Sequence, residues 1–349
     1  MKDINGQKKV GFAVLGLGIG MAHAEAISTS DVAYLVCGCD IDSKRLEKFS
    51  QKYPDAGITE SFDELLANEE VDVISVCLPT YMHADFASRA LRAGKHVLCE
   101  KPADITVERA MKIRDAERES GKMAGFVFQN RYNYLMYPIF EAIRSGRLGD
   151  IYLGTFAVKW HRKQKYYDNN GGWRGTWDKD GGGSLMNQSI HTVDLMLQLM
   201  GSEVADVRSV ARVVAHDIES EDMTASLITF KNGATATFVS TTCAYDGLST
   251  EIGVYGTGGS IEADADKLKR WRLRDDVDGI EEEELLEVYG MGNISASRNH
   301  PNVRTGHAYM VDDMASAILE GRRPAIGIED AVKSIDLIER IYKCARESK

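Results

Sequence analysis

Short apolar runs alternate with amphipathic stretches through the first third of the chain. Four runs have the length of a β-strand and lie at residues 9–16, 33–40, 71–78 and 96–100. The stretches between them space their apolar residues as a helix does, and two of them, 81–93 and 106–120, are each followed by a glycine. Continuous apolar strands separated by helices are typical of a parallel sheet covered on both faces. We therefore predict a parallel α/β domain over residues 1–130.

The pattern changes after about Arg131, where longer segments alternate apolar and polar positions. Residues 221–230 and 234–243 flank Lys231-Asn232-Gly233. An Asn-Gly pair fits the positive-φ positions of a tight hairpin turn. We therefore predict a second domain, residues 131–349, that contains a mainly antiparallel sheet.

Two further segments of the second domain carry a distinct pattern. Glu281 to Glu284 is a run of four acidic residues, and such a block predicts a solvated loop or edge. Residues 308–346 return to helical spacing, interrupted at Gly321 and Pro324. We therefore predict that residues 308–346 form helices. One arrangement that we consider packs the last helix back on the first domain.

The composition is that of an ordinary globular protein, with 44% hydrophobic and 27% charged residues. At 349 residues the chain is long enough for two domains. Its 53 acidic and 42 basic residues give a net charge of −11, which argues against nucleic acid or an anionic membrane as a partner. The longest apolar runs are strand-sized and the N-terminus is polar. We therefore expect neither a membrane span nor a secretory signal.

Six cysteines are present, and four of them lie in apolar runs that predict strands. Cys37 and Cys39 stand two residues apart without a second pair nearby, which is not the spacing of a zinc site. We therefore expect no metal, and thiols that pack as small hydrophobic groups. Cysteines of this kind favour a reducing cytoplasm.

The first candidate site is Gly16-Leu17-Gly18-Ile19-Gly20-Met21, directly after the first strand. A dinucleotide-binding turn needs glycines because its backbone approaches the pyrophosphate, which lies at the N-terminus of the following helix. The spacing is imperfect, since a glycine falls at position 20 and Met21 occupies the usual place of the last glycine. The motif nevertheless lies between a strand and a helix, as a dinucleotide site requires.

The second predicted strand ends in an acidic residue, Asp40. A carboxylate at this place accepts hydrogen bonds from the ribose hydroxyls and repels a 2′-phosphate, which favours NAD over NADP. Lys44 and Arg45 follow closely and soften this preference. The alternative is that Asp40 only caps the helix that begins near Asp42.

Polar groups also follow the third and fourth predicted strands. Pro79, Thr80 and His83 come after the third strand, and Glu100 and Lys101 end the fourth. Open α/β sheets bind their ligands at the carboxyl ends of the strands. A lysine there can act as a general acid or base, and the alternative is a surface ion pair. The spacing alone does not decide between the two.

Together these motifs resemble those of the glucose–fructose oxidoreductase and inositol dehydrogenase family, written Gfo/Idh/MocA. The resemblance extends over essentially the whole chain. Its motifs lie at residues 16–23, 79–83, 100–102, 172–177, 181–194 and 306–307. The Glu-Lys-Pro triplet combined with the triple glycine, histidine and aspartate run makes the resemblance specific.

The resemblance implies an N-terminal Rossmann domain and a C-terminal α/β domain whose large open sheet mediates dimer or tetramer contacts. We therefore expect a homodimer or homotetramer. It also implies that Lys101 is the catalytic lysine and His191 its partner histidine. Many members carry an aspartate four residues before that histidine, whereas this chain has Asn187. An asparagine can orient a substrate by hydrogen bonding, but it cannot take a proton.

The predicted site combines the motif residues with several neighbours. We expect the cofactor to contact Gly16, Gly18, Ile19, Gly20, Asp40, Pro79, Thr80, His83, Glu100, Lys101, Gln129, Trp173 and Arg174. We expect the substrate to contact Lys101, Arg131, Tyr166, Asn187, His191 and His307. Gln129 is predicted to lie at the end of the sixth strand. Asp194 either orients His191 or has a structural role.

The implied activity is hydride transfer between NAD(H) and a ring carbinol carbon of a sugar, glycoside, nucleotide sugar or inositol. Lys101 or His191 would remove the hydroxyl proton while the hydride leaves the same carbon. An alternative is a redox-neutral NAD-dependent glycosidase or lyase that oxidises the ring only transiently. A third possibility is a non-catalytic NAD-binding regulator, against which the presence of both Lys101 and His191 argues.

Overall fold

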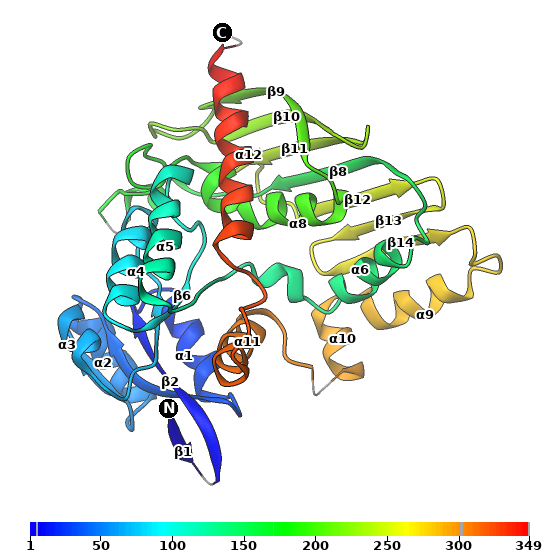
Figure 1. Ribbon diagram of the computed structural model, residues 1–349. Coiled ribbons are helices and arrows are strands. Elements are labelled where there is room, and N and C mark those ends of the chain that lie inside the picture. Colours follow the sequence, from blue (N-terminus) through cyan, green and yellow to red (C-terminus); the bar gives the residue numbers. More distant parts are fainter. Residues whose placement is uncertain (5, 170, 301–302, 348–349) are drawn as a thin grey trace. The chain divides into compact units, whose positions relative to one another are not determined.

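The structure, a computed structural model, describes residues 1–4, 6–169, 171–300 and 303–347 (Figure 1). The chain divides into two compact units. Unit 1 comprises Met1–Gln129 and Gly306–Val332, and unit 2 comprises Asn130–Thr305 and Lys333–Lys349. Within the described ranges, every helix is too short or too polar to cross a membrane.

Unit 1 is built on a parallel sheet with the strand order β4-β3-β2-β5-β6-β7. The strands are β2 (Gln7–Leu15), β3 (Ala33–Cys39), β4 (Gly57–Thr59), β5 (Val73–Val76), β6 (His96–Cys99) and β7 (Ala124–Phe126). A short strand, β1 (Lys2–Ile4), pairs with β2 in the antiparallel direction. Every residue of β5 is buried, as expected for a strand with both sheet faces covered. The predicted parallel sheet is confirmed.

The helices of unit 1 alternate with its strands, except for α11, which belongs to the later stretch of chain. They are α1 (Gly20–Ser28), α2 (Ser43–Lys52), α3 (Phe62–Ala67), the short 3₁₀ helix η1 (Thr80–Met82), α4 (His83–Arg92), α5 (Val107–Ser120) and α11 (Gly306–Glu320). Local signals set the ends of α5. The Thr106 hydroxyl accepts a hydrogen bond from the Arg109 N–H, and Gly121 ends the helix at φ 67°, a conformation that suits glycine.

Unit 2 contains a seven-stranded sheet with the order β14-β13-β12-β8-β11-β10-β9. The strands are β8 (Ile151–Lys159), β9 (Val204–Arg212), β10 (Met223–Phe230), β11 (Thr235–Thr241), β12 (Thr250–Gly256), β13 (Gly259–Asp264) and β14 (Lys267–Leu273). All neighbours pair antiparallel except β8 and β11. Strands β10 and β11 form the predicted hairpin, with Gly233 at φ 88°. The mainly antiparallel second sheet is confirmed.

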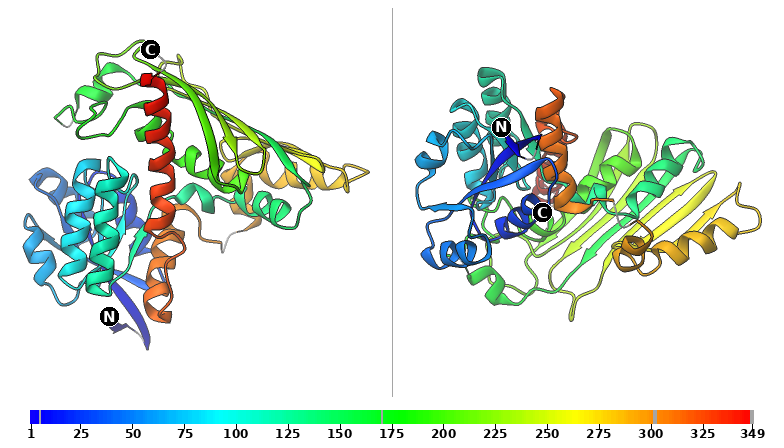
Figure 2. Two further views of the ribbon diagram at one scale, coloured as in Figure 1. Left: turned by 45° about the horizontal axis from the view of Figure 1, so that its top comes forward. Right: turned by 90° about the horizontal axis from the view of Figure 1, so that it is seen from below.

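Helices cover one face of this sheet, as the left view of Figure 2 shows. The helical segments of this part of the chain are η2 (Gln129–Tyr132), α6 (Met136–Arg144), α7 (Gln164–Asp168), the π-helical turn η3 (Ser184–Gln188), α8 (Ile190–Met200), α9 (Ile280–Tyr289), α10 (Asn293–Asn299) and α12 (Ile328–Glu347). Helix α8 packs against β8 and β12. On the other face, Val210 and Leu227 are each more than 40% exposed.

The acidic run Glu281–Glu284 lies in α9, so the predicted loop or edge is wrong. Acidic side chains in the first turn of a helix interact favourably with its unpaired N–H groups. Two of these glutamates also have basic partners, because Glu281 pairs with Arg147 at 2.6 Å and Glu282 pairs with Arg272 at 2.7 Å. These partners relieve the repulsion within the block, and the local sequence does not reveal them.

Candidate active site

The carboxyl ends of the central strands of unit 1 bring most predicted cofactor residues to one edge of the sheet. Strands β2, β3, β5 and β6 run parallel, so the segments that follow them share that edge. The glycine turn follows β2, Asp40 follows β3, Pro79 comes after β5, and Glu100 with Lys101 follows β6. This edge is where open α/β sheets bind their ligands.

The glycines of the turn are required for two different reasons. Gly16 has φ 91°, and a Cβ atom there would lie 2.5 Å from the carbonyl oxygen of Cys77. A Cβ at Gly20 would lie 2.6 Å from the Val14 side chain, so Gly20 permits close packing of α1 on β2. Gly18 is exposed, and its nearest neighbour would be Arg45 at 3.9 Å. The backbone at Gly18 is therefore open to a ligand.

Asp40 is tied to the glycine turn and does not cap α2. Its carboxylate accepts hydrogen bonds from the N–H of Leu17 at 2.7 Å and of Asp42 at 2.9 Å, and the Arg45 guanidinium lies 3.3 Å away. Asp42 is the N-cap of α2, since its side chain accepts from the Lys44 N–H. The carboxylate of Asp40 therefore lies beside the backbone that a dinucleotide would approach.

The residues present in unit 1 fit a dinucleotide. The open backbone at Gly18 and the N-terminus of α1 suit a pyrophosphate. Gln129 offers a second fit, because its buried Oε1 has no hydrogen-bond partner among the described residues. A buried acceptor without a partner is costly, and a ligand amide would satisfy it. Gln129 belongs to η2 and not to a strand end as predicted, since β7 already ends at Phe126.

His83 links the two loops that flank this edge of the sheet. The residue is buried at the start of α4. Its Nδ1 lies 2.6 Å from the carbonyl oxygen of Pro102, and its Nε2 lies 2.7 Å from that of Leu78. The side chain predicted to contact cofactor therefore holds the segments after β5 and β6 in place.

Glu100 is buried and bonded to two imidazoles. Its Oε1 lies 2.9 Å from Nε2 of His23 and 3.3 Å from Nε2 of His307. Its Oε2 accepts the N–H of Lys101 at 3.1 Å. Burial raises the pKa of Glu100, yet the hydrogen bonds from His23 and His307 outweigh it and bring this pKa well below its usual range. Glu100 is therefore a buried carboxylate that holds the backbone of Lys101.

In unit 2, the triple glycine packs against a buried glutamate. A Cβ at Gly183 would lie 1.8 Å from the carbonyl oxygen of Glu221. The Glu221 carboxylate accepts hydrogen bonds from the N–H of Gly183 and Leu185, from the Ser184 hydroxyl and from the Tyr342 hydroxyl. These contacts fix the turn that leads into η3 and α8. Asn187 lies in η3, and His191 is half-buried in the first turn of α8.

Asn187 is held by polar neighbours from two segments. Its Nδ2 donates to Asp180 at 2.6 Å, and its Oδ1 accepts from the Tyr166 hydroxyl at 3.1 Å. The Gln188 amide donates to the same hydroxyl at 2.6 Å. Burial raises the pKa of Tyr166, so the phenol stays neutral and donates. The structure therefore brings two of the predicted substrate residues, Asn187 and Tyr166, into direct contact.

Aromatic rings and guanidinium groups stack beside Tyr166. Arg174 lies over the Tyr166 ring at 4.6 Å and over the Trp173 ring at 5.0 Å, and Arg162 lies over the Trp160 ring at 5.1 Å. Such pairs are held by cation–π attraction. The predicted residues Trp173 and Arg174 thus belong to the same cluster as Tyr166.

Arg131 and Asp194 form a buried, bidentate ion pair. The Arg131 Nε and Nη2 atoms donate to the two Asp194 oxygens at 2.7 and 2.5 Å. The pair joins η2 to α8 and supports the structural interpretation of Asp194. The guanidinium group of Arg131, a predicted substrate residue, is thus paired with Asp194 of the same unit.

The sequence did not reveal several residues of this arrangement. His23, Asp180 and Gln188 contact predicted site residues, and Glu221 holds the triple-glycine turn before Asn187. His23 and Gln188 lie inside the motifs that carry the family resemblance, so the sequence could have identified them as candidate site residues. Glu221 lies outside them, and only the contact across 38 residues to Gly183 reveals it. The two predicted catalytic residues are divided between the units, with Lys101 in unit 1 and His191 in unit 2.

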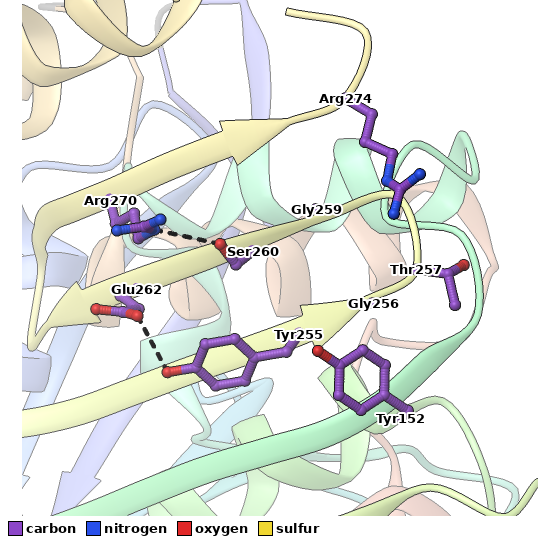
Figure 3. Close-up of a pocket in the computed structure, with 9 residues that line it drawn as sticks. All are labelled: Tyr152, Tyr255, Gly256, Thr257, Gly259, Ser260, Glu262, Arg270 and Arg274. Carbon is purple, nitrogen blue, oxygen red and sulfur yellow. Dashed lines mark hydrogen bonds between the residues drawn. The ribbon is translucent and has the colours of Figure 1, made fainter.

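A separate pocket of about 390 Å³ lies on the sheet of unit 2 (Figure 3). Its lining comes mainly from β12, β13 and β14 and comprises Tyr152, Tyr255, Gly256, Thr257, Gly259, Ser260, Glu262, Arg270 and Arg274. The Tyr255 hydroxyl donates to Glu262 and the Arg270 Nε donates to Ser260. None of the predicted site residues lines this pocket, so it is distinct from the candidate active site.

Comparison with known families assigns both parts of the chain. Residues 10–128 match the oxidoreductase family with an NAD-binding Rossmann fold. Residues 139–262 match the GFO/IDH/MocA C-terminal domain.

Individual relatives extend over most of the chain. The crystal structure of the WlbA dehydrogenase from Bordetella pertussis in complex with NADH and UDP-GlcNAcA has a TM-score of 0.87 and 28% identity, and the match covers 98% of this chain and 97% of that one. Inositol 2-dehydrogenase from Rhizobium meliloti is 26% identical over 73% of this chain and 76% of its own. The scyllo-inositol 2-dehydrogenase (NADP(+)) IolW from Bacillus subtilis is 23% identical over 98% of this chain and 94% of its own.

Proposed function

Because the chain belongs to the Gfo/Idh/MocA family of NAD-binding oxidoreductases, we propose that it transfers a hydride between NAD(H) and a ring carbinol carbon of a sugar, glycoside, nucleotide sugar or inositol. One observation carries the proposal. The glycine turn, Asp40 and the Glu100-Lys101 strand end lie at one edge of a parallel sheet. This arrangement supports the proposal, because open α/β sheets bind their ligands at this edge.

The chain's own residues divide the work of the reaction. Lys101 and His191 are the two candidate bases for the substrate hydroxyl proton, and we favour Lys101 because Asn187 cannot assist His191 as a carboxylate would. Asn187 and Tyr166 would orient substrate hydroxyls through their hydrogen-bonding groups. The nicotinamide ring would accept or donate the hydride. Trp173 and Arg174 present a flat, cationic surface suited to a polar ring or an anionic group.

A substrate panel tests the reaction. The protein is incubated with NAD⁺ and sugars, glycosides, nucleotide sugars and inositols, and each mixture is followed by reduced-cofactor fluorescence and by product analysis. A dehydrogenase forms NADH in proportion to the oxidised product. Product without net NADH would instead identify a redox-neutral enzyme, and cofactor binding without turnover of any class would contradict the proposed activity.

We further propose that NAD is preferred over NADP, because the Asp40 carboxylate lies at the turn and would repel a 2′-phosphate. Asp40→Asn keeps an acceptor for the Leu17 N–H but removes the charge. The ratio of the dissociation constants of NADP⁺ and NAD⁺ should fall by at least about tenfold. Asp42→Asn is the matched control, because asparagine caps a helix as well as aspartate does. An unchanged ratio in Asp40→Asn would assign the preference to other groups.

A further inference from the structure

A buried chain of four polar side chains lies behind the Lys101 backbone, and the proposed reaction does not use it. We call Ser75, His23, Glu100 and His307 the Glu100 network. The His23 Nδ1 lies 2.6 Å from the Ser75 hydroxyl, and both histidines direct Nε2 at Oε1 of Glu100. The two imidazole rings are 5.1 Å apart. The network joins α1, β5, the end of β6 and α11 within unit 1.

The hydrogen bonds define the protons of the network. The Glu100 oxygens only accept, so each Nε2 carries a hydrogen and each imidazole has its second nitrogen available for one more proton. The His23 side chain is 1% exposed and its Nδ1 faces Ser75, whereas the His307 side chain is 22% exposed. His307 is therefore the member that exchanges a proton with water. The network carries one negative charge when both imidazoles are neutral and none when His307 is protonated.

The titratable groups around the Glu100 network are two buried thiols and three carboxylates that have partners of their own. Burial raises the pKa of Cys77 and Cys99 well above the usual range, with Glu100 as a further cause, so both remain neutral thiols. Asp104, after β6, is paired with Arg109 at 2.7 Å.

On α11, Asp312 accepts from the Ser30 hydroxyl and Asp313 pairs with Arg322. Lys101 follows Glu100 directly in the chain, and Arg45 at the same sheet edge is paired with Asp40. Within the described part of unit 1, the Glu100 network is thus the group of side chains beside Lys101 whose net charge can change by proton exchange with water.

On the premise of the proposed function, we propose that His307, acting through Glu100, is a positioning residue that takes up a proton when the nicotinamide is reduced and releases it when the nicotinamide is oxidised. The oxidised ring is positively charged and the reduced ring is neutral. The oxidised cofactor therefore favours the negative network, and the reduced cofactor favours the neutral one.

The proton balance of the reaction closes with this step. Oxidation of an alcohol sends a hydride to the nicotinamide and releases the hydroxyl proton, first to Lys101 or His191 and then to water. His307 takes one proton from water as the ring loses its charge. While NADH stays bound, net proton release to the solvent is therefore smaller than one per hydride transferred. The proton held by His307 leaves when NAD⁺ replaces NADH, so a complete turnover releases one proton.

Calorimetric titrations of NAD⁺ and NADH in buffers of different ionisation enthalpy test the proposal without turnover. NADH should bind with uptake of protons relative to NAD⁺. The ratio of the NAD⁺ and NADH dissociation constants should fall as the pH rises, by about tenfold in total and never by more than tenfold per pH unit, the limit for one proton. Equal proton numbers for the two cofactors would overturn the proposal.

Matched variants assign the proton to His307. His307→Gln keeps a donor for Glu100 but does not titrate, so the pH dependence of the ratio should disappear. It should persist in a Lys101→Met, His191→Gln double variant, which removes the other two candidate proton carriers. Loss of the pH dependence in that double variant, or its persistence in His307→Gln, would overturn the proposal. Binding of neither cofactor would overturn the proposed function as well.

If His307→Gln does not fold, the double variant still tests the proposal, because a difference in proton uptake between NAD⁺ and NADH that persists there excludes residues 101 and 191 as its source. Both cofactors binding with no such difference would leave the proposed function intact and remove only the role of His307. The two failures are therefore distinguishable.

Discussion

Lys101 follows a buried strand whose end is fixed on both sides. Glu100 holds its N–H, and His83 holds the carbonyl of Pro102. These contacts place the backbone of Lys101 at the ligand-binding edge of the sheet. A fixed backbone suits the proton transfer that we propose for Lys101.

Lys101→Met should lower turnover by roughly a thousandfold, as expected for loss of a general acid/base. NAD⁺ affinity should stay within a few-fold, because the glycine turn and Asp40 are unchanged. Turnover and fluorescence-monitored binding measure the two quantities. Lys95→Met is the control, since Lys95 lies in the same unit and donates only to the backbone carbonyls of Asn68 and Val71 among the contacts described. Turnover within tenfold of the parent in Lys101→Met would exclude the catalytic role.

His96, at the start of β6, makes stability depend on pH. Burial lowers its pKa from 6.5 to about 4, with the charge of Lys122 as a second cause. A base whose folded pKa is depressed contributes stability that is present above pH 6.5 and lost as the pH falls toward 4, because the unfolded chain binds the proton first.

His96→Asn should therefore be less sensitive to acid than the parent. Between pH 7 and pH 5 the parent should lose roughly 2 kcal/mol more stability than the variant. Asparagine keeps an acceptor for the Met123 N–H, which bonds to Nδ1 of His96 at 3.2 Å. Thermal midpoints at the two pH values measure the difference. Parallel shifts in both proteins would show that His96 is not the group responsible.

At the scale of elements, the turn at Gly181–Gly183 is set by what lies against it. Gly183→Ala should shift the turn and η3, because a Cβ would lie 1.8 Å from the Glu221 carbonyl oxygen, a backbone atom that cannot rotate away. Overpacking of this kind costs about 1–3 kcal/mol or more. Gly327→Ala, which meets no atom within 4 Å, is the control. Equal melting temperatures for the two variants would contradict this account of the triple glycine.

The sequence predicted those helices and turns whose ends are set by residues close by in the chain. It did not predict those that are held by distant residues. Thr106 and Gly121 set the ends of α5 by contacts within a few residues, and the Asn-Gly pair did the same for the β10–β11 hairpin. The π-helical turn η3 has no such signal, because the distant Glu221 and Tyr342 hold it. Helix α9 was missed because an acidic block alone predicts a solvated segment, and Arg147, the partner of Glu281, lies 134 residues earlier in the chain.

In the candidate site, too, contiguous motifs were predicted and contacts between distant residues were not. The glycine turn and the Glu100-Lys101 pair were found because each is a contiguous motif next to a strand. The Arg131–Asp194 pair spans 63 residues and the Glu100–His307 contact spans 207. No local pattern encodes such contacts, so Arg131 and His307 were predicted only as substrate residues.

At the scale of the whole molecule, the uncovered face of the unit 2 sheet should join copies of the chain. Val210 and Leu227 lie on neighbouring strands and are 44% and 43% exposed, and exposed apolar positions on a sheet face favour association. A Val210→Lys, Leu227→Lys double variant should have a lower mass by light scattering than the parent. Ala205→Lys, at an exposed position of the same strand β9, is the control. A parent that is monomeric, or an unchanged mass in the double variant, would contradict this prediction.

Unit 1 is assembled from two stretches of chain separated by nearly all of unit 2. Helix α11 packs on α1, β2 and β3, and the Phe126 N–H donates to the carbonyl oxygen of Ile326. During translation, the N-terminal sheet must therefore leave the ribosome with this side uncovered and wait until residue 332 has been made. A nascent chain of this kind should depend on chaperones more than one whose domains are completed in order.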